Sequence, residues 1–173
     1  MESRSRSGRL FDHYLIVDWS AAAAPVRGRD SIWIASLQTG PRGSSLRDCN
    51  PGTRAEATGR IRALLLAALA AGRRTLLGVD FPLGYPRGFA GALGLGAARL
   101  PWWAVWDEIA AQIEDHADNR NNRFEAAAVF NTRISGAAAP FWGRPPGYAA
   151  AGAALGARTL TPVPWLMPPL ART

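Results

Sequence analysis

Two aspartates each follow a short apolar run, and together they could hold a metal ion. Asp18 follows "YLIV" at residues 14–17, and Asp80 follows "TLLGV" at residues 75–79. Carboxylates bind the hard cations Mg²⁺ and Mn²⁺, which take oxygen ligands. Ions held in this way can activate a water molecule and stabilise a leaving oxygen at phosphorus. The pair predicts a Mg²⁺ or Mn²⁺ site, provided that the two apolar runs are neighbouring strands.

The elements around the two aspartates predict that these runs are indeed neighbours. Hydrophobic patterns indicate three strands, a helix capped by Thr53 and a fourth strand, over residues 14–19, 30–39, 45–50, 54–71 and 74–79. Because a helix precedes the last strand, we expect that strand to run parallel to the first. Asp18 and Asp80 would then lie at the carboxyl ends of parallel strands, where open α/β sheets bind ligands.

Four further residues are candidates for the same site. Glu125 lies among apolar neighbours in "RFEAAA", where a carboxylate is costly, so it is a candidate third metal ligand. An ion pair of Glu125 with Arg120 or Arg123 is an equal alternative. Ser20 could contact a phosphate or a metal-bound water, or simply cap a turn. Asn122 and Arg123 could bind a phosphate oxygen, or end the preceding helix.

The rest of the chain predicts three parts. Residues 1–12 are expected to be a mobile arm, residues 13–147 an α/β domain, and residues 148–173 an irregular tail rich in Pro, Ala and Gly. Within the domain, residues 88–99 read as a connector and residues 101–118 as a helix that begins at a proline.

Composition excludes several kinds of site. All 20 basic residues are arginine, so a Walker-type phosphate loop, a pyridoxal Schiff base and a lysine base are all excluded. The net charge of +7 is uneven, because residues 126–173 hold four arginines and no acid. A single cysteine and the lack of a membrane-length apolar run predict a cytoplasmic protein that does not span a membrane.

Four segments carry a resemblance to a known family. "VDWSAA", "DSIWIA", "GVDFPLGYP" and "NNRFEAAAVFN…PFWG", within residues 14–147, resemble a bacterial family of unknown function described as predicted RNase H-fold nucleases. Some of its members are labelled molybdopterin-guanine dinucleotide biosynthesis proteins. The resemblance implies an α/β fold with a ribonuclease H-like mixed sheet and flanking helices. It also implies metal-dependent hydrolysis of a phosphodiester in a nucleic acid or nucleotide, with Asp18, Asp80 and Glu125 as catalytic metal ligands.

Two alternatives stay open at this point. The fold is shared with sugar kinases and actin-like ATPases, which makes a nucleotide-binding phosphotransferase or ATPase the second candidate. The third is a non-catalytic, degraded family member. Enzymes of this fold generally add a late carboxylate or histidine, whereas no Asp, Glu or His follows Glu125. We therefore expect a truncated or frame-shifted C-terminus that lacks late elements of the fold.

Overall fold

The structure is a computed structural model that describes residues 10–41 and 43–143. Most of the predicted arm at residues 1–12 and all of the predicted tail at residues 148–173 lie outside the described residues. The described chain forms two compact units. Of the described residues, unit 1 holds those as far as Pro82 together with residues 116–120, and unit 2 holds residues 83–115 and 121–143.

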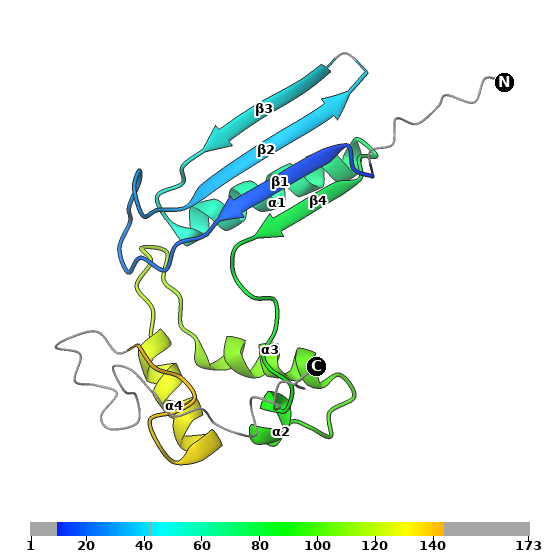
Figure 1. The fold of residues 1–173 in the computed structure, drawn as a ribbon. Helices are drawn as coiled ribbons and strands as arrows, with labels where there is room; N and C mark the ends of the chain where they lie inside the picture. The colour runs from blue at the N-terminus through cyan, green and yellow to red at the C-terminus, as the bar shows by residue number, and fades with distance from the viewer. Residues whose placement is uncertain (1–9, 42, 144–173) are drawn as a thin grey trace, which may run out of the picture. The chain divides into compact units, whose positions relative to one another are not determined.

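Unit 1 is built on a four-stranded mixed sheet with strand order β3-β2-β1-β4 (Figure 1). Strand β1 is antiparallel to β2 and parallel to β4, and β2 is antiparallel to β3. The helix α1 makes the crossover between β3 and β4, as a parallel connection requires. The bounds are β1 His13–Asp18, β2 Trp33–Gly40, β3 Gly43–Cys49, α1 Arg54–Ala70 and β4 Thr75–Val79. The predicted α/β class and the parallel pairing of the first and last strands are confirmed.

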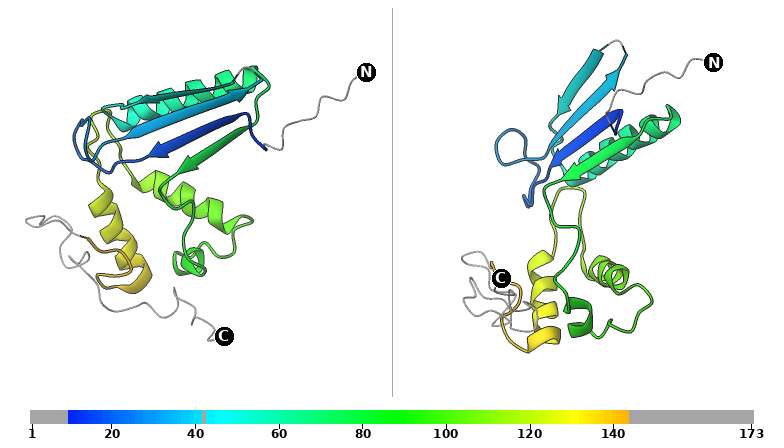
Figure 2. Two further views of the ribbon diagram at one scale, coloured as in Figure 1. Left: turned by 45° about the horizontal axis from the view of Figure 1, so that its top comes forward. Right: turned by 45° about the vertical axis from the view of Figure 1, so that its right-hand side comes forward.

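Helix α1 covers one face of this sheet (Figure 2). The Thr53 side chain caps the helix by accepting a 3.1 Å hydrogen bond from the Glu56 backbone N–H. Apolar side chains at helical spacing then pack on alternate residues of the strands. This core contains Leu15, Val17, Ile34, Ala57, Ile61, Leu64 and Leu65. On the opposite face, Ile16, Trp33, Leu46 and Leu76 are exposed.

The described part of unit 2 contains three helices around a small apolar core. They are α2 Phe89–Ala92, α3 Pro101–Gln112 and α4 Arg123–Ser135, and the core includes Phe89, Val105, Ala126 and Phe130. No helix in the described ranges is both long and apolar enough to cross a membrane.

Two sequence predictions fail in unit 2. The predicted connector at residues 88–99 contains the short helix α2, which packs Phe89 into the core. The predicted helix at residues 101–118 ends at Gln112, because the Asn122 side chain binds the backbone on both sides of Ile113. Its Oδ1 accepts from the Glu114 N–H at 2.8 Å, and its Nδ2 donates to the Gln112 carbonyl at 2.9 Å.

Candidate functional site

The structure brings Asp18 and Asp80 to one end of the sheet. Val17 of β1 pairs with Val79 of β4, so the next residue on each strand is an aspartate. The Oδ1 atom of Asp80 accepts a 3.0 Å hydrogen bond from the backbone N–H of Trp19, the residue after Asp18. The two acids therefore occupy adjacent strand ends, as the sequence predicts.

Both carboxylates are exposed, and neither forms an ion pair within the described part of the chain. Neighbouring strands are about 4.8 Å apart, so two ionised carboxylates at adjacent strand ends repel unless a cation or a proton lies between them. This donor set fits a hard cation, because Mg²⁺ is often held by one or two carboxylates together with water and phosphate oxygens. The described residues hold no group of three or more His, Cys, Asp or Glu side chains that could hold a metal.

An aromatic pair lies beside the two acids. Trp19 and Phe81, which each follow one aspartate, meet edge to face with ring centroids 5.9 Å apart and an interplanar angle of 71°. Edge-to-face packing of this kind adds stabilisation beyond the burial of area. The pair holds the two strand ends against each other. This contact was not predicted, although the chain repeats an apolar run followed by an aspartate and an aromatic residue, and that repeat was a usable signal.

Ser20 lies on the loop that follows Asp18, and its hydroxyl group is used within that loop. The hydroxyl donates to the Asp30 carbonyl at 3.0 Å and accepts from the Ala22 N–H at 3.2 Å. These bonds are those of a turn-capping serine, one of the two roles considered for it. A ligand-binding role for Ser20 stays a prediction.

Two buried residues support the same loop, and sequence reasoning missed both. The Arg54 side chain donates to the Ala22 carbonyl at 2.8 Å and to the Asn119 carbonyl at 2.6 Å. The Asn119 side chain accepts from the Arg54 backbone N–H at 2.8 Å and donates to the Ala24 carbonyl at 3.1 Å. A buried arginine and asparagine of this kind have no local sequence signal, because their partners are 32 to 95 residues away.

The other three candidates lie in unit 2, at the start of α4. One carboxylate oxygen of Glu125, Oε2, is buried and has no hydrogen-bond partner among the residues that the structure describes. Asn122 uses its whole side-chain amide to end α3. Arg123 donates to Asn121 Oδ1 at 3.2 Å, and its guanidinium lies 4.5 Å from the centre of the Phe124 ring. Roles for these three residues at a phosphate or metal stay predictions.

Comparison with known proteins adds no relative. No model of a protein family matches the chain, and no match was found among curated proteins or solved structures.

Proposed function

We propose that the protein is a metal-dependent nuclease-like hydrolase that cleaves a phosphodiester of a nucleic acid or nucleotide. The observation that supports this proposal best is the pairing of Asp18 and Asp80 at the ends of adjacent parallel strands, with a hydrogen bond from Trp19 to Asp80. In the described residues no arginine neutralises either acid by an ion pair, although arginine is the only basic residue of the chain apart from histidine.

The two aspartates would bind the metal in different ways, because only Asp80 is oriented by a backbone hydrogen bond. Asp80 is oriented by the Trp19 N–H through one oxygen, which leaves its other oxygen for a ligand. Asp18 ends β1 on the face that carries Tyr14 and Ile16, opposite the face covered by α1. A Mg²⁺ or Mn²⁺ ion held here would supply Lewis acidity for attack of water at phosphorus. The exposed position of both acids leaves room for a substrate phosphate.

Two further observations support the narrower ribonuclease H-like assignment. The strand order β3-β2-β1-β4, with a helical crossover before β4, agrees with the β-β-β-α-β beginning on which the resemblance rests. A buried carboxylate oxygen without a partner is costly, and among the described residues the Oε2 atom of Glu125 has no hydrogen-bond partner. Glu125 is the third metal ligand that the resemblance implies, and that role stays a prediction.

The proposal is tested by titrating the full chain with Mn²⁺ in a calorimeter. Asp18→Asn and Asp80→Asn are expected to lower the affinity by at least about tenfold, since each removes a charged ligand. Asn at position 80 keeps an oxygen for the Trp19 N–H, so its fold should be preserved. Asp107→Asn, at an exposed acid of unit 2, is the matched control and should bind like the native protein.

The same four proteins are then assayed for cleavage of labelled single- and double-stranded DNA and RNA with Mg²⁺ or Mn²⁺. Loss of cleavage in the Asp18 and Asp80 variants alone supports the proposal. Equal metal affinity in all four proteins would overturn it. Glu125→Gln completes the series: a reduced affinity makes Glu125 a ligand, and an unchanged affinity restricts the site to Asp18 and Asp80.

A further inference from the structure

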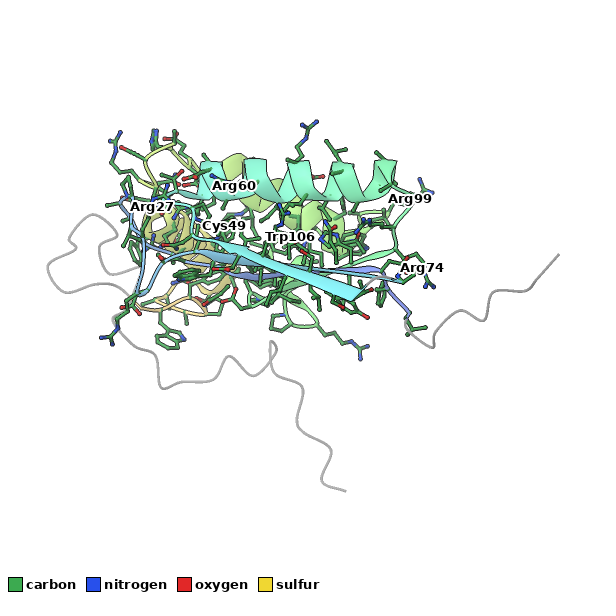
Figure 3. All side chains as sticks on the ribbon, turned by 90° about the horizontal axis from the view of Figure 1, so that it is seen from above. Arg27, Cys49, Arg60, Arg74, Arg99 and Trp106 are labelled. Atoms are coloured by element: carbon green, nitrogen blue, oxygen red, sulfur yellow. The ribbon has the colours of Figure 1, made fainter. Side chains whose placement is uncertain are left out.

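Unit 1 contains a cavity of about 470 Å³ between α1 and the strands β2 and β3. Arg60 on α1 and Cys49 at the end of β3 both line it, and both side chains are labelled in Figure 3. The volume falls within the usual range for small-molecule sites. Asp18, Asp80 and Ser20 do not line this cavity, so it is distinct from the proposed metal site.

The cavity combines an apolar wall with a row of polar groups. Ile34, Ala63 and Leu64 supply the apolar wall from β2 and α1. Ser36, Gln38 and Ser45 supply two hydroxyl groups and an amide from β2 and β3. An apolar surface with a few fixed polar groups is the usual composition of a ligand site.

Bonds from outside the cavity fix two of these polar groups. Ser36 Oγ is 2.9 Å from Nε2 of His13, and Nδ1 of His13 is 3.2 Å from Thr75 Oγ1. His13 is fully buried, and this burial, together with the nearby charge of Arg73, lowers the pKa of its imidazole and favours the neutral form. Arg73 also donates to the Gln38 side-chain oxygen at 2.7 Å. Ser36 and Gln38 are therefore held in place before any ligand arrives.

The charged residues at the cavity favour an anion. Arg47 and Arg60 line it from the sheet and the helix, against one carboxylate, that of Asp48. Glu56 holds Arg60 through hydrogen bonds of 3.2 and 3.1 Å, but Glu56 also pairs with Arg27, so this trio keeps one positive charge. Arg47 forms no ion pair with any residue in the described ranges.

We propose that this cavity binds a small organic anion. Its apolar body would lie against Ile34, Ala63 and Leu64, and its carboxylate or phosphate would face Arg47 and Arg60. Arginine suits both anionic groups because its planar guanidinium donates two parallel hydrogen bonds. This site is independent of the metal site, so either proposal can fail without the other.

Cys49 provides a reporter inside the cavity, because it is the only cysteine of the chain and lines the site. Its alkylation by iodoacetamide is followed by mass spectrometry in the presence of phenyl phosphate, benzoate, inorganic phosphate or neutral benzyl alcohol. Phenyl phosphate or benzoate is expected to slow alkylation by about tenfold at saturation, and benzyl alcohol is expected to leave it unchanged. The two anions show whether phosphate or carboxylate is preferred, and inorganic phosphate shows whether the apolar body is needed.

A charge variant completes the test. The double variant Arg47→Gln and Arg60→Gln should lose the protection, whereas Arg62→Gln, at an exposed arginine of the same helix that does not line the cavity, should keep it. Equal protection by benzyl alcohol would overturn the proposal, as would protection that survives in the double variant. Failure of both organic anions to protect Cys49 in the native protein would overturn it without any variant.

Discussion

Asn119 is expected to be the residue of the 116–120 segment on which the stability of unit 1 depends most. The residue is buried and adopts a left-handed conformation, with φ of 72°. Its side chain satisfies the backbone N–H of Arg54 in the first turn of α1, at 2.8 Å. Asn tolerates left-handed φ values better than most residues. The substitution Asn119→Ala removes both advantages at once.

The size of the effect follows from the bonds that are lost. The Arg54 N–H would be buried without a partner, which costs about 1–3 kcal/mol. Alanine in a left-handed conformation adds about 1 kcal/mol. The Asn119 amide also donates to the carbonyls of Ala24, at 3.1 Å, and Gly52, at 3.4 Å. Losing these two bonds adds little, because the Gly52 carbonyl keeps its 3.0 Å bond from the Val26 N–H and Ala24 is exposed to water. Asn119→Ala should therefore lower the free energy of unfolding by about 2–4 kcal/mol.

The measurement is urea unfolding of the full chain, followed by circular dichroism, together with hydrogen exchange of the peptide that contains Arg54. His116→Ala, at an exposed side chain of the same segment, is the control. Asn119→Gly loses the same bonds without the left-handed strain and should lie between Asn119→Ala and the native protein. If Asn119→Ala stays within about 0.5 kcal/mol of the control, the bonds of Asn119 do not stabilise unit 1 and the reasoning is refuted.

Two further predictions concern His13 and Thr53. Burial and the charge of Arg73 lower the pKa of His13 below its unfolded value of 6.5, so the unfolded chain binds more protons than the folded one near that pH. The contribution of neutral His13 to the free energy of unfolding should therefore be fully present above pH 6.5 and should decrease as the pH falls below it. Urea titrations from pH 7.5 to 5.5 should show this slope in the native protein and a weaker one in His13→Asn. Thr53→Ala should lower the free energy of unfolding by about 1 kcal/mol, since it removes the cap of α1. Thermal unfolding measures the effect. Thr132→Ala, near the end of α4, is the control that shows whether loss of any threonine near a helix end has the same effect.

The first half of the chain could be predicted from the sequence because its signals are local. The alternation of buried residues along β1 and the helical spacing of apolar residues in α1 both indicate burial in the core between the sheet and α1. These local patterns were enough to predict that Asp18 and Asp80 lie at one edge of the sheet. The end of α3 could not be found in this way, because it depends on the side chain of Asn122, ten residues after Gln112. The supporting contacts of Arg54 and Asn119 were missed for the same reason, since only the folded chain brings them together.

The short segment at residues 116–120 has a consequence for the order in which the protein is made. Unit 1 includes this segment, yet it is separated from the rest of the unit by residues 83–115, which belong to unit 2. On the ribosome, all four strands and α1 leave the exit tunnel before Asn119 does. The Arg54 N–H in the first turn of α1 therefore has no Asn119 side chain to bind until the 36 residues from Leu83 to Asp118 have been synthesised. A fragment that stops at Pro82 would keep all four strands β1–β4 but would lack Asn119, which accepts the hydrogen bond from the Arg54 N–H at the start of α1.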